Sequence, residues 1–285
     1  MWVDTWGEHM HHGFYPVPTG RERRRSIEDH ILAQELMINN ALKWSYLGTV
    51  DEDIERLKSP AYLGKDGFRL VDVGCGVGGS SRFICREYGA AGKGISLSNR
   101  QIELANNMTQ AVGLSASLQY EKGDALSMPF GDHSCDLAWS MESGEHMPDK
   151  VKFVQELKRV VSPGGRVIIV TWCQRENDNE ALSDREQGLL HKICDAYYLP
   201  EWVSASEYVT IATQLGFEDV RCDDWTDHVK PFWGGVIRSC LQPRNLWRVL
   251  SGGRMTIKAA LASLWMKKGI TSGVVRFVIV TAKVP

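Results

Sequence analysis

The chain has 285 residues, 43% of them hydrophobic, and a formal net charge of −2 at pH 7. This composition supports a buried core and excludes a disordered chain, and the near-neutral charge offers no field for polyanions, so we expect no nucleic-acid partner. Its seven cysteines include no C-x-x-C pair, so neither a zinc cluster nor a disulfide framework is predicted. No signal peptide and no apolar run long enough to span a bilayer is found, which predicts a soluble protein in a reducing compartment.

Residues 1–60 are predicted to form an N-terminal cap that includes helices. Trp6–Tyr15 is rich in aromatic residues and histidines, and a basic run, Arg21–Arg25, follows it. His9, His11 and His12 do not have the spacing of a usual zinc site, so we expect no metal. The aromatic rings favour either a lid over a cationic ligand or an arm packed on the core.

A long helix is expected next. Ser26 is of a residue type that caps helix N-termini. Ile27, Ile31, Ile38 and Leu42 follow at helical spacing, which predicts one buried face.

From residue 68 onward, apolar runs alternate with amphipathic stretches, as in parallel strands joined by crossover helices. We expect strands at 69–73, 92–96, 117–121, 135–140, 165–172, 217–224 and 273–282, and helices at 79–88, 98–112, 149–160, within 180–200, at 204–215 and within 233–264. This pattern predicts one α/β domain over residues 1–285, with a Rossmann-like mixed sheet, helices on both faces and an inserted helical cap. Residues 68–172 would form the cofactor-binding core, and 175–270 the substrate-side cap with the remaining core elements.

A glycine-rich turn follows the first strand. Gly74–Gly79 fits G-x-G-x-x-G and, when Asp72 is counted, also D-x-G-x-G-x-G. Such glycines let the backbone approach either a pyrophosphate or a carboxylate. A carboxylate at position 72 would repel pyrophosphate and can face the amino group of a methionine moiety, which favours S-adenosylmethionine. The residues predicted to bind it here are Asp72, Gly74, Cys75, Gly76 and Gly78.

Further donor-binding residues are expected where neighbouring strands end, because ligands bind at the carboxyl edge of open α/β sheets. Ser96 stands where dinucleotide enzymes and many methyltransferases carry an acid, and would make neutral hydrogen bonds. Asp124 with Ala125 follows the third strand and suits the adenine amino group, although G-D is also ordinary turn chemistry. Ser140, at the end of the fourth strand, completes the set.

The reaction itself is expected at the segment after the fourth strand. Glu142, Glu145 and His146 are its polar candidates. We select His146 and Glu142 as catalytic, with His146 as a base if the acceptor must lose a proton. A helix-capping or core role for these side chains is equally consistent with the sequence. Farther on, Asp223–Trp233 either lines the acceptor pocket or forms an ordinary strand-to-helix loop.

Several strings together carry a family resemblance. The chain resembles the gamma-tocopherol C-methyltransferases, a family similar to plant enzymes that N-methylate monoterpenoid indole alkaloids. The strings include Trp6–Tyr15, Val71–Gly76, Gly79–Arg82, Trp139–Lys150, Pro163–Arg166, Ile168–Cys173 and Pro231–Trp233. The resemblance extends over essentially the whole chain, while Gly234 and Gly235 depart from the family pattern and put the pocket shape in doubt.

The resemblance implies transfer of a methyl group from S-adenosylmethionine to an aromatic carbon of a chromanol, which converts gamma- to alpha-tocopherol and delta- to beta-tocopherol. The alternatives are N-methylation of an indole alkaloid or another small amine and, from another class, a cofactor-binding protein without catalysis. The acceptor would be a small hydrophobic aromatic molecule, and the resemblance implies a plastid location, although no transit peptide is recognised; a cytoplasmic location is the alternative. The basic runs Arg21–Arg25 and Lys267–Lys268 either contact a membrane surface or form solvated charged faces. A homodimer is a further expectation.

Overall fold

A computed structural model describes residues 8–15, 27–50, 67–177, 180–240 and 253–285. Its core is a seven-stranded sheet with the order β3-β2-β1-β4-β5-β7-β6. The strands are β1 (Arg69–Val73), β2 (Ala91–Ser96), β3 (Leu118–Lys122), β4 (Cys135–Met141), β5 (Val161–Gln174), β6 (Glu218–Asp224) and β7 (Val275–Lys283). The first five run parallel, and β7 is antiparallel to both β5 and β6. The predicted mixed sheet is therefore confirmed.

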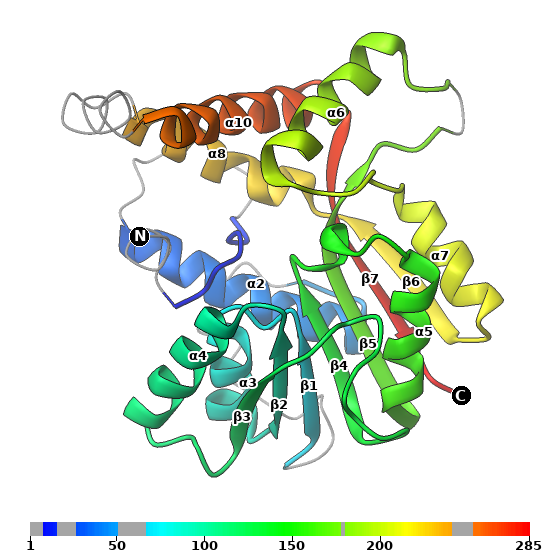
Figure 1. The fold of residues 1–285 in the computed structure, drawn as a ribbon. Coiled ribbons are helices and arrows are strands. Elements are labelled where there is room, and N and C mark those ends of the chain that lie inside the picture. The colour runs from blue at the N-terminus through cyan, green and yellow to red at the C-terminus, as the bar shows by residue number, and fades with distance from the viewer. Residues whose placement is uncertain (1–7, 16–26, 51–66, 178–179, 241–252) are drawn as a thin grey trace.

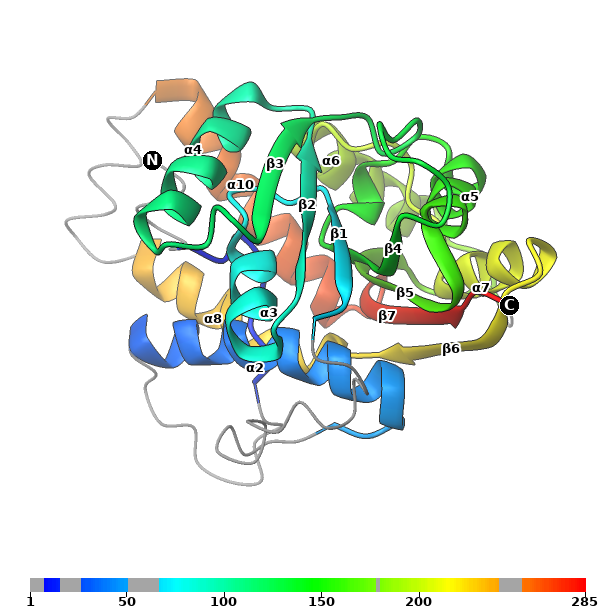
Figure 2. The same ribbon diagram turned by 90° about the horizontal axis from the view of Figure 1, so that it is seen from below.

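Helices cover both faces of this sheet (Figures 1 and 2). They are α2 (Ile27–Leu47), α3 (Gly79–Tyr88), α4 (Asn99–Ala111), α5 (Lys150–Val160), α6 (Asp184–Tyr197), α7 (Ala205–Gln214), α8 (Thr226–Cys240) and α10 (Gly253–Thr271), with a short 3₁₀ turn, η3 (Gly144–His146). Buried side chains of α2 and α3 pack on one face, and those of α5 and α7 pack on the other. Figure 1 shows α6, α8 and α10 gathered beyond the carboxyl ends of the strands, where the inserted cap was expected.

Local chemistry explains several element boundaries. Ser98 and Asp149 cap α4 and α5 by accepting backbone N–H groups, and Ser204 begins a capping box at α7. Unpaired N–H groups at a helix start make such residues favourable. Gly89 ends α3 in the left-handed conformation, which glycine adopts without steric cost.

Three details of the predicted elements were wrong. Ile31 is 43% exposed although Ile38 and Leu42 are fully buried, so the buried face of α2 does not include it. The helical stretch expected near 233–264 is present as α8 and α10. Strand β5 begins at Val161 rather than residue 165, with a register irregularity opposite Cys135 and Leu137. The predicted strand-to-helix loop at 223–233 is mostly the start of α8. The cap at Ser26 lies outside the described residues.

Among the described helices, none is both long and apolar enough to cross a membrane.

Candidate functional site: a glycine-rich loop and an aromatic enclosure

The glycine-rich loop joins β1 to α3 at the carboxyl edge of the sheet. The backbone N–H groups of Gly74 and Cys75 both donate to the Ile95 carbonyl, at 3.0 and 2.9 Å, which ties the loop to β2. Gly74, Gly76 and Gly78 have φ values of 79°, 56° and 77°. This left-handed region is strained for other residues, so the turn requires glycine.

Close neighbours add a second reason for glycine in this loop. A Cβ atom at Gly78 would lie 2.6 Å from the Tyr120 ring, and one at Gly74 would lie 2.3 Å from the Ser143 Cβ. The loop is therefore held between β3 and the segment that follows β4. The side chain of Cys75 packs inward beside Tyr120, so the predicted role of Cys75 in donor binding falls to its backbone.

The N-terminus of α3 lies under residues 8–15, here called the N-terminal segment. No side chain caps this helix end at Gly78, and a Cβ atom at Gly79 would lie 2.1 Å from the Glu8 carbonyl oxygen. The sulfur of Met10 would lie 3.7 Å from a Cβ at Gly76. The N-terminal segment thus crosses directly over the loop and over the free N–H groups of α3, which favour a bound carboxylate.

Asp72, on β1 just before the loop, is 2% exposed. Its Oδ2 accepts a hydrogen bond of 2.6 Å from Ser81 Oγ, which lies 3.1 Å from the Tyr120 hydroxyl. Burial raises the pKa of Asp72 to about 6, against the opposing effects of Ser81 and the Arg82 guanidinium. The Asp72 carboxylate is thus a buried, only partly compensated negative charge beneath the loop, which would gain from a cationic amino group nearby.

Ser96, Asp124 and Ala125 lie along the same edge, where the N–H of Gly123 donates to the Ser96 carbonyl. Ser96 Oγ donates to Gln101 Oε1 at 2.7 Å. Asp124 is exposed, and its Oδ1 accepts from the Leu126 N–H at 2.9 Å. The turn chemistry expected as the alternative for Asp124 is therefore present. This contact uses one carboxylate oxygen and does not exclude an adenine role for the other.

The segment after β4 is fastened to the glycine loop through serines. Ser140 Oγ and Ser143 Oγ are 2.7 Å apart, and Ser143 donates to the Val73 carbonyl at 2.6 Å. Ser140 is fully buried. Any contribution of Ser140 to a donor site would therefore act through Ser143.

Glu142 faces the N-terminal segment from the end of β4, in a left-handed conformation with φ of 51°. Its Oε1 accepts from the His12 backbone N–H at 2.5 Å, and its Oε2 lies 2.7 Å from His12 Nδ1. Trp172 Nε1 donates to the same Oε2 at 3.3 Å. Burial opposes ionisation, but His12 outweighs it, so the pKa of Glu142 lies below its usual value. Glu142 is a buried carboxylate held as an anion.

His146 and Glu145 occupy different surroundings. His146 lies in η3 with an exposed side chain, and partial loss of hydration and the Lys150 ammonium lower its pKa. Glu145 is 4% exposed and accepts from Thr171 Oγ1 at 2.7 Å. Burial, with the nearby Glu142 charge, raises the pKa of Glu145 to about 8. Among the described contacts, the histidine that partners Glu142 is His12 and not His146.

Aromatic rings enclose His12. The ring centroids of Trp172, Phe232 and Trp233 lie 5.1, 4.5 and 5.3 Å from the His12 ring, and Phe277 lies at 6.0 Å. These rings come from β5, α8 and β7. We call His12, Trp172, Phe232, Trp233 and Phe277 the aromatic enclosure.

The aromatic lid expected from Phe14 and Tyr15 is not formed by those residues. Phe14 stacks on His228 at 3.8 Å and meets the edge of Trp225, while the Tyr15 hydroxyl contacts His30. Both rings are buried in the core, which matches the packed-arm alternative. Trp6 lies outside the described residues. Within the described residues, no group of three potential ligands could hold a metal ion.

Sequence reasoning missed the residues that hold the site together. Gln34 on α2 donates from Nε2 to the carbonyls of His9 and His11, at 2.6 and 2.7 Å. Ser81 and Tyr120 form the hydrogen-bonded support of Asp72. The sequence shows only a glutamine within a predicted helix at position 34, and the partners of Gln34 are backbone atoms that no sequence pattern marks.

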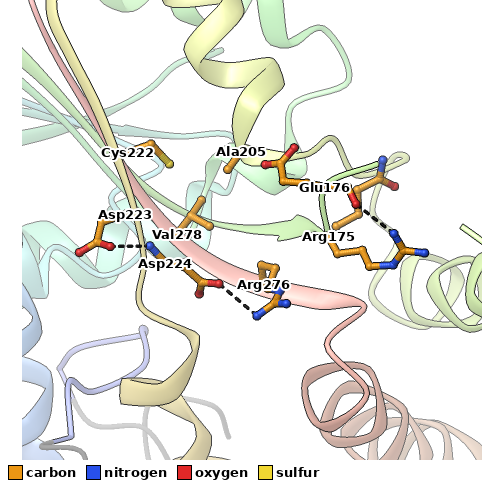
Figure 3. Close-up of a pocket in the computed structure, with 9 residues that line it drawn as sticks. Arg175, Glu176, Ala205, Cys222, Asp223, Asp224, Arg276 and Val278 are labelled. Atoms are coloured by element: carbon orange, nitrogen blue, oxygen red, sulfur yellow. Dashed lines mark hydrogen bonds and ion pairs between the residues drawn. The ribbon is translucent and has the colours of Figure 1, made fainter. Parts of the chain in front are cut away.

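A separate pocket lies on the β5-β7-β6 side of the sheet (Figure 3). Asp224 and Arg276 form a 3.1 Å ion pair in it, and Arg175, Glu176 and Cys222 also line it. Its charged lining does not suit a hydrophobic acceptor, and the glycine loop is on the other side of β4 and β5.

Comparison with known proteins places this geometry in a family. Residues 71–169 match a methyltransferase domain model. The chain is 46% identical to a rice protein described as a probable chloroplastic tocopherol O-methyltransferase, and 43% identical to the chloroplastic tocopherol O-methyltransferase of Arabidopsis thaliana. Each alignment covers 100% of this chain, with 75% and 79% of the respective relative.

Two more distant proteins are also similar. Norajmaline N-methyltransferase of Rauvolfia serpentina is 32% identical, over 99% of this chain and 92% of the relative. The crystal structure of a protein from Galdieria sulphuraria, described as a putative sarcosine dimethylglycine methyltransferase, superimposes with a TM-score of 0.78 at 20% identity, covering 99% of this chain and 96% of that one.

The sheet order, the glycine loop at its carboxyl edge and the matched domain define a methyltransferase with the class I, Rossmann-like fold. The fold class predicted from the sequence is confirmed. Within that class, the chain belongs to the tocopherol methyltransferase family, as the sequence resemblance indicated.

Proposed function

We propose that this enzyme transfers the methyl group of S-adenosylmethionine to a ring carbon of gamma-tocopherol and delta-tocopherol, which gives alpha- and beta-tocopherol. The observation that carries the proposal is identity of 43–46% to tocopherol methyltransferases along the whole chain. The aromatic enclosure around His12 supports it, because apolar rings suit a hydrophobic aromatic acceptor. The names of these relatives give oxygen as the atom that accepts the methyl group. The choice of a ring carbon instead follows from the family resemblance described in the sequence analysis.

The residues at the carboxyl edge fit the methyl donor. The uncapped start of α3 offers N–H groups to its carboxylate, and Asp72 offers a negative charge for its amino group. His9 Nδ1 and His11 Nε2 are buried polar atoms with no hydrogen-bond partner in the described part of the chain, and His9 Nδ1 would lie 3.0 Å from a Cβ at Gly79. The donor's sulfonium supplies an electrophilic methyl group, and the protein must align the acceptor with it.

The proposed donor residues therefore fall into two groups by function. The loop backbone at Gly74, Cys75, Gly76 and Gly78 with Asp72 would hold the amino-acid part. Ser96, Asp124 and Ala125 would hold the nucleoside part, and Ser140 would support the loop from behind.

The test uses S-adenosylmethionine labelled in its methyl group, offered separately with gamma-tocopherol, delta-tocopherol and an indole alkaloid amine. We expect label in alpha- and beta-tocopherol, located on the ring carbon by NMR. Label on the phenolic oxygen would contradict ring methylation, and label only in the amine would overturn the choice of acceptor.

N-methylation of an alkaloid is the second candidate, supported by the 32% identity to norajmaline N-methyltransferase. A plastid location is proposed because both tocopherol relatives are named as chloroplastic. Contact with a membrane surface and a homodimer stay predictions.

A further inference from the structure

We propose that His12 is the general base that removes the phenolic proton of the acceptor, and that Glu142 is the residue that positions it. This inference rests on the proposed function, because only a phenolic acceptor needs such a base. It changes the roles expected from the sequence, where His146 was the base and Glu142 its catalytic partner.

The first argument is the geometry of the pair. Glu142 receives both the backbone N–H and, at 2.7 Å, the Nδ1 of His12. Two hydrogen bonds to one carboxylate fix both the backbone and the ring of His12. A carboxylate that accepts from Nδ1 selects the tautomer in which Nδ1 carries the proton and Nε2 is the basic nitrogen.

The second argument is the surroundings of the ring. His12 is 5% exposed and lies among Trp172, Phe232 and Trp233, so an aromatic acceptor that enters this enclosure meets its base there. The N-terminal segment that carries His12 also lies over the glycine loop through Met10. One short segment therefore joins the donor-binding loop to the proposed base.

The described neighbours of His12 come from its own segment, the end of β4, β5, α8 and β7. On its own segment His11 contacts the His12 carbonyl through Nδ1 at 2.9 Å, and burial lowers the pKa of His11, which favours its neutral form. After β4, Glu142 is the facing carboxylate, and burial raises the pKa of the nearby Glu145. The contacts from β5, α8 and β7 are the uncharged rings of Trp172, Phe232, Trp233 and Phe277.

The proposed step balances as follows. The acceptor's O–H bond breaks and its proton moves to His12 Nε2, which leaves a phenolate with raised electron density at the ortho carbon. That carbon forms a bond to the methyl group while the methyl–sulfur bond breaks, and the sulfonium becomes a neutral thioether. The methylated carbon then loses its ring proton to water, and the oxygen regains the proton from His12.

The test compares His12→Asn with the wild type for gamma-tocopherol methylation between pH 6 and 10. We expect kcat at neutral pH to fall by about 10²- to 10⁴-fold, the usual contribution of a general base. The activity of the variant should then rise about tenfold per pH unit as the solution approaches the pKa of a phenol, about 10. The wild type should not show this rise.

Further variants complete the design. His191→Asn removes an exposed histidine of α6 and should behave as the wild type. Glu142→Gln should lower kcat, and combining it with His12→Asn should cost little more than His12→Asn alone, because the two act as a unit. His146→Asn should leave the pH profile unchanged. If His12→Asn folds poorly, His12→Gln gives the same readout.

Binding of S-adenosylhomocysteine and the thermal unfolding midpoint should stay close to the wild-type values in each variant used. An equal loss at every pH, no loss in His12→Asn, or a pH-dependent loss in His146→Asn instead would overturn the assignment. If the wild type does not methylate a tocopherol, the proposed function fails. If the wild type does so and His12→Asn is as active, only the assignment of His12 fails.

Discussion

Asp72, the residue proposed to face the amino group of the donor, is unfavourable for folding when it is charged. Its carboxyl group is fully enclosed, and burial raises its pKa to about 6 from an ordinary value of 3.8. An acid with a raised folded-state pKa destabilises the folded protein once pH exceeds the unfolded-state value, because the unfolded chain ionises more easily. The destabilisation grows between about pH 4 and pH 6 and is constant above that window.

We therefore expect Asp72→Asn to stabilise the folded protein and to weaken donor binding. The free energy of unfolding at pH 7 should rise by about 1–3 kcal/mol, since one pKa unit corresponds to about 1.4 kcal/mol. The wild type and variant should converge below pH 4. Chemical unfolding across pH and calorimetry with S-adenosylhomocysteine measure the two effects.

Ser81→Ala is the matched control for Asp72→Asn. It keeps the carboxyl group and removes the 2.6 Å hydrogen bond that favours its charge, so the folded protein should lose stability at pH 7. Unchanged donor affinity in Asp72→Asn would show that this carboxylate does not face the amino group.

At the scale of the element, the turn between β1 and α3 combines unusual dihedral angles with very close neighbours. Gly78 and Gly113 have similar φ values of 77° and 74°. A Cβ at Gly78 would lie 2.6 Å from Tyr120, whereas a Cβ at Gly113 would have no atom within 4 Å. The two positions therefore separate backbone strain from steric overlap.

We expect Gly113→Ala to cost about 1–2 kcal/mol, the strain of the left-handed conformation alone. Gly78→Ala should cost clearly more and should also weaken binding of S-adenosylhomocysteine, because Tyr120 and the loop must move apart. Urea unfolding and calorimetry of both variants give the comparison. Equal losses of stability would mean that the contact with Tyr120 is unimportant.

The N-terminal segment is attached to α2 by one side chain. Gln34 donates to two carbonyls of that segment, so Gln34→Ala leaves two buried acceptors without this partner. We expect a higher KM for the donor and faster proteolytic cleavage within residues 8–15, with a loss of about 1–3 kcal/mol in the free energy of unfolding. Gln110→Ala, at an exposed position of α4, should change none of these.

At the scale of the molecule, periodicity predicted most elements to within a few residues. The bounds 69–73 and 79–88 match β1 and α3, because apolar runs and the glycine turn are local signals. Strand β5 was predicted to begin too late because Gly164 and Gly165 indicate a turn, yet their backbone hydrogen bonds with Val284 and the pairing of Val161 with Cys135 keep them within the strand. Tertiary pairing of this kind is not encoded by local sequence.

The candidate site divides in the same way. The loop glycines, Asp72 and Glu142 could be selected from the sequence because they lie at or just after the carboxyl ends of strands. The partner of Glu142 could not, since His12 is 130 positions away in the chain and meets it only after α2 and the sheet have packed. The sequence analysis selected His146 as the base because it lies close to Glu142 in the chain.

The place of β7 in the sheet predicts a sharp limit for truncation. This strand pairs with both β5 and β6, so a chain stopped after residue 274 leaves two strands without their shared partner. We expect that chain to be unfolded or aggregated by circular dichroism and gel filtration. Removal of the exposed Pro285 alone should have no effect, and a soluble, cooperatively folded 1–274 chain would contradict the expectation.

The same strand order affects synthesis of the protein in the cell. Every other strand is made before β7, so the growing chain carries an unpaired β5 edge until the ribosome has passed residue 283. Exposed strand edges promote association with other chains. We therefore expect the nascent protein to be most prone to association with other chains late in translation, and slow codons before residue 275 to lengthen that interval.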